Sequence, residues 1–485
     1  MSAKKRFGLG VVFGALAALG HAPFGLWPVA LAGFLGLFWL VAASNRPGWA
    51  AYAVGIGYFA VVLHWIVEPF LVDAATHGWM APFALGLCAA GFALFWGLAG
   101  WLAGRVFRDQ RILAFAILLV GAELLRGHIL TGFPWALPAY IWADTPMRMV
   151  VAWTGSYGLS FVMLVSLALP FAIGRIAGTL WGAAILGVTF ALGAMRAAPV
   201  EDTPTLGQVR LVQPNIPQRE KWDFEKVPEH LQRLIDLSRD TEAELVIWPE
   251  SSVAYHLDQA EPVLQAASNA AGVPIIAGLN RRADKDVWHN SLAVVGSDGN
   301  VVETYDKVHL VPFGEYIPFR IDFLRAMAAS SGFGFTPGDS VRLIETPLGG
   351  ALPLICYEGI FPGHLFKADA RPDYLLQITN DAWFGNFSGP FQHLDQMRFR
   401  AAEQGLPLVR AANTGVSAVI DRFGRIEVSL ELNEAGYLDH SIHGGVRTLY
   451  SYTGDWPAIV FVLLSMAALL PRKSRNTVAS GAGSS

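Results

Sequence analysis

A cysteine, a glutamate and a lysine stand where apolar, strand-like runs of the sequence end. Each follows one run: Cys356 follows residues 351–355, Glu250 follows residues 245–248, and Lys307 follows residues 301–305. In a sheet covered by helices, ligand sites gather beyond the carboxyl ends of strands, so folding can bring these three residues together. A thiol is mostly protonated at neutral pH and needs a base or a nearby cation to act as a nucleophile. The three residue types therefore predict thiol-based nucleophilic catalysis.

The three side chains divide the work of a covalent mechanism. We expect Glu250 to take the thiol proton of Cys356 and Lys307 to stabilise both the thiolate and an oxyanion. The backbone N–H of Tyr357 is the expected second oxyanion donor. Each residue taken alone is more often ordinary: a small core cysteine, a surface carboxylate or a solvated loop lysine. The joint pattern is what favours catalysis.

The only other cysteine, Cys88, lies inside a long apolar run. If that run is in lipid and Cys356 is outside it, the two thiols cannot meet. We therefore expect a free thiol at Cys356 and no disulfide.

The composition is that of a membrane protein with a soluble domain. Of the 485 residues, 53% are hydrophobic and 15% are charged, against about a quarter charged in soluble proteins. The mean hydropathy is +0.40. Apolar runs fill residues 7–195 and 456–470, whereas residues 201–447 are typical of a soluble α/β domain large enough for its own core. The net charge of −4 gives no indication of nucleic-acid binding.

Eight apolar runs are candidates to cross a bilayer, for which about 20 residues are needed. They are residues 7–20, 26–43, 49–67, 79–104, 112–130, 150–173, 176–195 and 456–470. This pattern predicts four segments: a seven-helix transmembrane domain (1–197), a soluble catalytic domain (201–447), a final transmembrane helix (455–471) and a disordered cytoplasmic tail (472–485). Glu123 and Arg126 are one helical turn apart in the fifth run, and we expect them to form a structural pair near the membrane interface.

Basic residues set the orientation of these runs. They lie before the first run, in every second connection and after the last run: Lys4, Lys5, Arg6, Arg46, Arg105, Arg108, Arg111, Arg175, Arg472, Lys473 and Arg475. The positive-inside rule places both termini in the cytoplasm and residues 201–447 in the periplasm of a bacterial inner membrane. Residues 7–20 also fit a cleaved signal peptide, and cleavage would leave this orientation unchanged.

The soluble domain alternates strands with helices. We expect strands at 209–213, 245–248, 273–278, 292–295, 301–305, 341–345, 351–355, 374–379, 406–410 and 417–420, and helices at 225–239, 261–271, 361–368 and 390–403. The stretch Ser297-Asp298-Gly299-Asn300 is a hairpin turn signal. Alternation with hairpins predicts a mixed sheet covered by helices.

Several motifs resemble those of known families. The stretches Trp248-Pro249-Glu250, 305–316 (YDKVHLVPFGEY) and Ile355-Cys356-Tyr357-Glu358 resemble the Glu–Lys–Cys motifs of the nitrilase superfamily. With the apolar runs on both sides, and with Gln213-Pro214-Asn215-Ile216, Lys221-Trp222 and 380–385 (NDAWFG), nearly the whole chain is similar to the apolipoprotein N-acyltransferase family.

The resemblance implies an α-β-β-α sandwich and assigns roles to named residues. Glu250 is implied as the general base, Lys307 as the oxyanion stabiliser and Cys356 as the nucleophile. Four further residues are implied to support the site: Glu315, Tyr357, Glu358 and Trp222. For Trp222, a core anchor is the equally weighted alternative.

Two apolar, glycine-flanked loops are candidates for a mobile lid that dips towards lipid. They contain Phe333 and Phe335, and Trp383 and Phe384. Simple caps on the core are the alternative, and the lid is slightly favoured.

The implied reaction moves a fatty acyl chain in the last step of lipoprotein maturation. The chain passes from a membrane phospholipid, through a thioester on Cys356, to the N-terminal amine of the diacylglyceryl-cysteine of an apolipoprotein. The expected partners are this phospholipid donor, the diacylated apolipoprotein acceptor and the bilayer, with no nucleic acid, cofactor or metal.

Two other functions compete with this reading. A membrane-tethered amidase or nitrilase that hydrolyses small C–N substrates needs only one anchor, so eight spans count against it. A transporter with a binding domain is disfavoured because no pathway of paired charges crosses the spans, and because the Glu–Lys–Cys set is intact.

Overall fold

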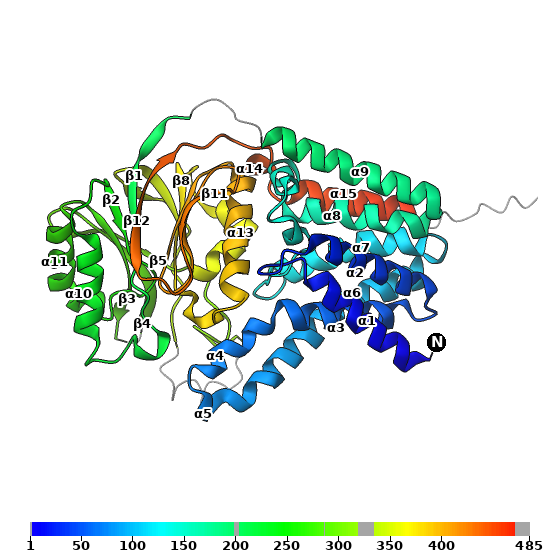
Figure 1. Ribbon diagram of the computed structural model, residues 1–485, viewed down its shortest axis with the longest axis horizontal. Helices are drawn as coiled ribbons and strands as arrows, with labels where there is room; N and C mark the ends of the chain where they lie inside the picture. The colour runs from blue at the N-terminus through cyan, green and yellow to red at the C-terminus, as the bar shows by residue number, and fades with distance from the viewer. Residues whose placement is uncertain (1, 198–202, 286, 319–333, 471–485) are drawn as a thin grey trace, which may run out of the picture.

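The apolar runs of the sequence fold as helices. In the computed structural model, which describes residues 2–197, 203–285, 287–318 and 334–470, all eight runs are helical. They are α1 (Ala3–Ala18), α2 (Trp27–Ala43), α3 (Pro47–Val62), α6 (Ala81–Val106), α7 (Arg111–His128), α8 (Val151–Ala172), α9 (Arg175–Arg196) and α15 (Trp456–Leu469). Proline in the first turn begins α2, α3, α6 and α15, where its missing N–H costs no intrahelical bond. These helices form one end of the molecule (Figure 1).

Three helical stretches in the described residues are long and apolar enough to cross a bilayer alone: Ala74–Val106, Pro146–Ala172 and Arg175–Arg196. A fourth arises if α3 and the segment His64–Leu71, bent by 61°, form one span. The shorter α2 and α15 have 17 and 14 residues. At about 1.5 Å per residue, neither reaches the roughly 30 Å of hydrocarbon unaided. All eight predicted runs are therefore apolar helices, but only three or four of them are long enough to cross a bilayer, so eight spans stay a prediction.

Small residues let the helices pack closely. A Cβ built on Gly14 of α1 would lie 1.9 Å from the Val54 carbonyl oxygen, and one on Gly57 of α3 would lie 2.0 Å from that of Val11. Such close backbone approach is the usual way in which membrane helices associate. The expected Glu123–Arg126 ion pair is present and fully buried, and Trp96 Nε1 donates a hydrogen bond to Glu123 at 2.7 Å.

The strands form two sheets. In the described part of residues 203–443, the strand orders are β12-β1-β2-β3-β4-β5 and β11-β10-β9-β8-β7-β6. The strands of the first sheet are β1 (Thr205–Gln213), β2 (Leu245–Ile247), β3 (Ile275–Asp284), β4 (Val287–Val295), β5 (Val301–Asp306) and β12 (Gly436–His443). Those of the second are β6 (Ile344–Thr346), β7 (Gly349–Ile355), β8 (Tyr374–Thr379), β9 (Leu408–Ala412), β10 (Ser417–Ile420) and β11 (Ile426–Leu430).

Helices cover the outer faces of both sheets. Helices α10 (Val227–Ser238) and α11 (Glu261–Ala271) lie on the far side of the first sheet, and α13 (Gly389–Gln404) lies between the second sheet and the helical unit (Figure 1). This α-β-β-α sandwich is the fold that the family resemblance implies. The single mixed sheet predicted from alternation is wrong, because alternation does not determine which strands pair.

Three details differ from the sequence prediction. Strands β11 and β12 were not predicted, because their residues are mixed polar and only partly buried. The helix expected at residues 361–368 is a 3-10 helix, η9 (Pro362–Lys367).

Polar contacts join the helical unit to α13. Ser156 of α8 donates to Glu403 Oε1 from both its backbone N–H (2.9 Å) and its hydroxyl (2.6 Å). Arg398 pairs with Asp144 at 2.7 Å. The helix that covers the second sheet is therefore bonded to the apolar bundle as well.

Candidate active site

The candidate nucleophile occupies a strained turn. Cys356 follows β7 directly and begins the 3-10 helix η8 (Cys356–Ile360), with φ of 51° and 6% exposure. Its carbonyl oxygen accepts hydrogen bonds from Gln377 Nε2 (3.1 Å) and lies 3.2 Å from His393 Nε2. Ser251 and Phe313, near the other candidates, also have positive φ, at 47° and 63°. Backbone strain of this kind clusters at functional sites.

Glu250 is held by partners from both sheets. It follows β2, and its Oε1 accepts a hydrogen bond from Asn290 Nδ2 of β4 at 2.7 Å. Its Oε2 accepts one from the backbone N–H of Asn380, which follows β8, at 2.8 Å. The carboxylate thus lies between the sheets at the carboxyl ends of their strands.

Lys307 lies between two carboxylates. Its side chain is 1% exposed, and Nζ donates to Glu315 Oε1 at 2.9 Å and lies 3.5 Å from Glu250 Oε1. Asn290 Nδ2 also bonds Glu315 Oε1, at 2.8 Å, so it joins the two carboxylates. The backbone N–H of Val311 holds the other oxygen of Glu315 at 2.8 Å.

The electrostatics define the resting protonation state. Burial and the Glu250 carboxylate raise the pKa of the Cys356 thiol, against the opposing effect of Lys307. Burial alone would raise the pKa of Glu250, but Lys307, the Asn290 amide and a second lysine hold it below its usual range. Burial would lower the pKa of Lys307, but Glu315 and Glu250 raise it well above its usual value. At neutral pH the site therefore contains a thiol, a carboxylate and an ammonium group.

Glu358 is part of the backbone framework of the site. It is fully buried and accepts hydrogen bonds from the backbone N–H groups of Ile355 (2.8 Å), Val308 (2.7 Å) and His309 (3.1 Å). It thereby connects the loop after Lys307 to the strand that ends at Cys356. Burial outweighs these three donors and raises the pKa of Glu358 to about 7.

Tyr357 connects the nucleophile turn to the helical unit. Its hydroxyl donates to the carbonyl oxygen of Gly132 at 3.4 Å, and its ring packs edge-on against Phe361. His309 bonds the neighbouring carbonyl of Thr131 at 3.0 Å through Nε2. Both sides of the site are therefore fastened to the segment that follows α7.

The aromatic residues predicted near the site differ in exposure and packing. Trp222 is 45% exposed, so the core-anchor alternative for it is wrong. Trp383 is 38% exposed, whereas Phe384 packs against Trp65 and Trp135 with ring centroids 4.8 and 5.6 Å apart. The half-buried Phe335 donates its backbone N–H to the Glu315 carbonyl at 3.0 Å. Phe333 lies outside the described residues.

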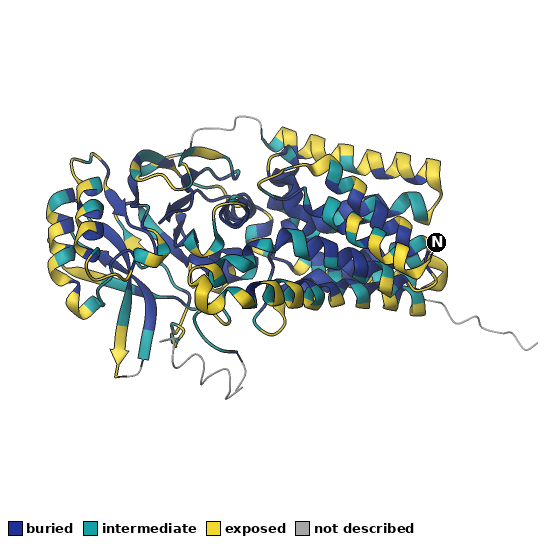
Figure 2. Ribbon diagram, turned by 60° about the horizontal axis from the view of Figure 1, so that its bottom comes forward, coloured by how far each residue is buried: buried dark blue, intermediate teal, exposed yellow. Residues whose placement is uncertain are grey.

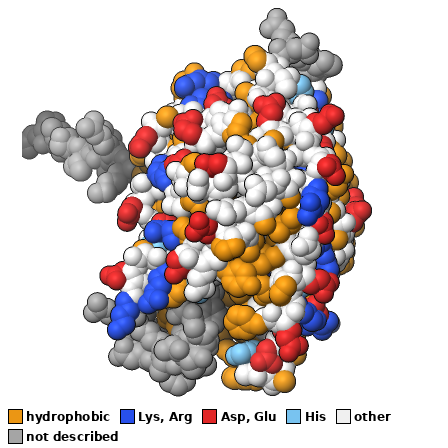
Figure 3. Space-filling view, turned by 90° about the vertical axis from the view of Figure 1, so that its left-hand side faces the viewer, with side chains coloured by type: hydrophobic (Ala, Val, Ile, Leu, Met, Phe, Trp, Pro, Cys, Tyr) orange, Lys and Arg blue, Asp and Glu red, His pale blue; other side chains and the backbone are white. Residues whose placement is uncertain are grey.

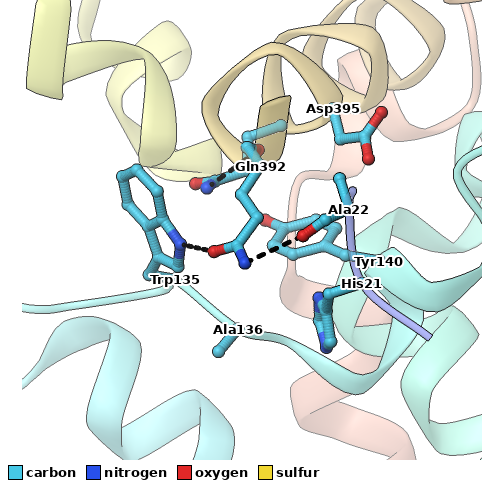
Figure 4. A pocket seen from close by; sticks show the side chains of 8 residues that line it. His21, Ala22, Trp135, Ala136, Tyr140, Gln392 and Asp395 are labelled. Atoms are coloured by element: carbon cyan, nitrogen blue, oxygen red, sulfur yellow. Dashed lines mark hydrogen bonds between the residues drawn. The ribbon is translucent and has the colours of Figure 1, made fainter. Parts of the chain in front are cut away.

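A small cavity lies where the helical unit meets α13 (Figure 4). In Figure 4, Gln392 of α13 lies between Trp135, whose Nε1 donates to it at 2.8 Å, and the carbonyl of Ala22, to which it donates at 3.1 Å. The Trp135 ring stacks on His393 at 5.8 Å, and His393 Nδ1 is 2.9 Å from Asp381. A continuous set of contacts thus leads from the helical bundle to the carbonyl of Cys356.

Sequence reasoning missed Asn290, His393 and Gln377. Asn290 lies within a strand and His393 and Gln377 within buried elements, where no local pattern distinguishes them from ordinary polar residues. Among the described residues, no group of three or more His, Cys, Asp or Glu side chains could hold a metal ion.

Comparison with known proteins identifies the family. Residues 208–450 match the carbon-nitrogen hydrolase family, and residues 13–169 match the apolipoprotein N-acyltransferase N-terminal domain. The chain is 37% identical to the apolipoprotein N-acyltransferase of Rhodopseudomonas palustris, covering 97% of this chain and 95% of the relative. It is 39% identical to that of Caulobacter vibrioides, covering 94% and 93%. The chain therefore belongs to the apolipoprotein N-acyltransferase family.

Proposed function

We propose that this protein transfers a fatty acyl chain from a membrane phospholipid, through a thioester on Cys356, to the N-terminal amine of a diacylated apolipoprotein. The observation that carries the proposal is the buried set Glu250, Lys307 and Cys356. Its neighbours Tyr357 and His309 hydrogen-bond the segment that follows α7 of the apolar bundle. Family membership over nearly the whole chain, helical unit included, counts against a tethered amidase.

In the first step Glu250 takes the proton of Cys356, and the thiolate attacks the ester carbonyl carbon of the phospholipid. Lys307 and the backbone N–H of Tyr357 stabilise the oxyanion of the tetrahedral intermediate. When the intermediate collapses, the C–O bond breaks and Glu250 returns its proton to the leaving alkoxide. The products are a lyso-phospholipid and an acyl-thioester on Cys356.

In the second step the acceptor amine attacks the thioester carbonyl. Glu250 accepts the amine proton and passes it to the Cys356 thiolate as the C–S bond breaks. A thioester is reactive enough towards an amine that this step needs no other source of energy. Water has to be kept out meanwhile, and the apolar loops around Phe335 and Trp383 are suited to that role.

We expect ping-pong kinetics, because two bulky membrane-anchored substrates use one nucleophile in turn. Double-reciprocal plots should give parallel lines when phospholipid and acceptor are varied. One equivalent of lyso-phospholipid should also be released when acceptor is absent. Intersecting lines, together with no lyso-phospholipid in the absence of acceptor, would contradict the two-step scheme.

The surface of the helical unit supports contact with lipid. Helix α9 buries only a narrow stripe of small residues and exposes most of its apolar side chains (Figure 2). Large exposed residues recur on three helices: Leu87, Leu94 and Trp101 of α6, Ile176, Leu180 and Trp181 of α9, and Phe461, Leu463 and Leu464 of α15. The far face of the sandwich instead shows scattered charges of both signs, with one apolar patch (Figure 3). The extended apolar surface of α6, α9 and α15 is typical of a membrane-embedded unit.

We place residues 1–197 and 455–471 in the inner membrane as eight spans, residues 201–447 in the periplasm and residues 472–485 in the cytoplasm. The alternation of basic residues motivates this topology. Reporter fusions after Met195 and before Trp456 should report the periplasm, and a fusion after Arg475 should report the cytoplasm. A cytoplasmic signal from either of the first two fusions would overturn the orientation.

A further inference from the structure

A second lysine is buried beside the catalytic set. Lys221 follows the 3-10 helix η6 (Gln218–Glu220), is 4% exposed, and its Nζ donates to the backbone carbonyl of Glu250 at 3.1 Å. The next residue, Trp222, is 45% exposed. A lysine is rarely buried fully unless it is paired, so its position beside Glu250 requires an explanation.

The charges around the Cys356 thiol explain why a second lysine is buried here. The carboxylates of Glu250, which is buried, and Glu315, whose side chain is 12% exposed, share the single positive charge of Lys307. Asp381, also near the thiol, is already paired with Arg410 and His393. An unpaired buried charge is costly, so a second cation is needed to balance the second carboxylate.

Lys221 is placed to be that cation. Burial lowers its pKa to about 8, while Glu250 and Cys356 act in the opposite direction. At pH 7 it therefore keeps its proton, and the resting site has two positive and two negative charges. When Cys356 gives its proton to Glu250, the negative charge moves to sulfur and the balance is kept. Without Lys221, the thiolate and Glu315 would share the single charge of Lys307.

We propose that Lys221 is a second cationic positioning residue, which fixes the backbone at Glu250 and favours the thiolate form of Cys356. This deepens the proposed function, because it rests on Cys356 being the nucleophile. The competing explanation is that Lys221 only fastens the loop that carries Trp222 through its bond to the Glu250 carbonyl.

The two explanations make different predictions for Lys221→Gln, which keeps a donor for that carbonyl and loses the charge. The test is the rate at which iodoacetamide alkylates Cys356, read by peptide mass spectrometry so that Cys88 is scored separately, from pH 6 to 10. Since a nearby opposite charge shifts a pKa by about 1–3 units, Cys356 in Lys221→Gln should be alkylated about tenfold or more slowly than in the wild type below about pH 8, where Lys221 is charged. The two rates should converge at higher pH, where the wild-type lysine loses its proton.

The control is Lys226→Gln, which removes the same charge from a residue that is 42% exposed at its side chain and pairs with Glu220 at 3.0 Å. It should keep the wild-type profile, and Lys221→Arg, which keeps the charge, should lie closer to wild type than Lys221→Gln. Glu250, Lys307 and Asp381 also act on the thiol and are unchanged in all variants.

A folded Lys221→Gln protein with the wild-type profile would overturn the proposal. If that variant does not fold, Lys221→Met keeps the apolar stem and is judged by the same criterion. Alkylation requires neither phospholipid nor acceptor. A rate lowered below about pH 8 in a protein that makes no acyl-thioester would therefore refute the proposed function and leave the charge effect standing.

Discussion

Replacing Cys356 with alanine should abolish acyl transfer and leave the protein folded. Both steps of the proposed mechanism pass through this sulfur, and Cys88 lies in α6 within the helical bundle. Loss of a nucleophile removes roughly ten thousandfold or more of turnover. Alanine fits a site that already holds a small buried side chain, so the thermal unfolding midpoint in detergent should change little. Turnover is measured as lyso-phospholipid release and as acylated acceptor.

Cys88→Ala is the matched control for this prediction. It removes the other thiol from the chain and should retain wild-type transfer. If Cys356→Ala kept more than about one per cent of wild-type turnover, a covalent role for this residue would be untenable.

Lys307→Met should lose both activity and stability. The side chain is 1% exposed and lies against Glu250 and Glu315, so its removal leaves two largely buried carboxylates without their shared cation. Loss of one oxyanion donor costs about a hundredfold or more in turnover. Breaking a buried ion pair by removing one partner costs about 3–5 kcal/mol of folding free energy. Turnover and the unfolding midpoint are measured on the same preparation.

A second variant separates these two effects. Lys307→Met combined with Glu315→Gln removes a positive and a negative charge together, so it should recover part of the lost unfolding midpoint. It should recover no turnover, because the oxyanion donor is still missing. Near-normal turnover in Lys307→Met would end the assigned role of this lysine.

The pH dependence of Lys307→Met tests the direction in which Lys307 shifts the pKa of Glu250. Lys307 is the largest of the groups that hold the pKa of Glu250 below its usual range, so its removal should raise that pKa. Glu250 would then be protonated over more of the acidic range. The acidic limb of the pH–activity profile of Lys307→Met should therefore lie at higher pH than that of the wild type.

The candidate catalytic residues could be predicted from the sequence because each follows an apolar strand. Glu250 follows β2, Lys307 follows β5 and Cys356 follows β7, and the carboxyl ends of such strands gather at one edge. That the strands belong to two sheets could not be predicted from alternation alone. The site lies between the sheets, as the bond from the Asn380 N–H to Glu250 illustrates.

The polar residues that hold the site together could not be predicted from the sequence, and the reason is a different one. Asn290 connects two carboxylates, and His393 contacts the carbonyl of the nucleophile, only because folding brings residues from distant strands and helices together. A lone Asn in a strand or His in a helix has no spacing that indicates this role. The link between Trp135, Gln392 and the helical bundle is likewise set by tertiary packing.

The central claim is a covalent acyl-enzyme on Cys356, and intact mass measurement tests it most directly. The purified protein is incubated with phospholipid and no acceptor, and is then weighed before and after treatment with hydroxylamine. The mechanism predicts a mass increase of one acyl chain, mapped to Cys356, removed by hydroxylamine, and passed to the acceptor amine when acceptor is added. Transfer to acceptor without any acyl adduct on Cys356 would contradict it.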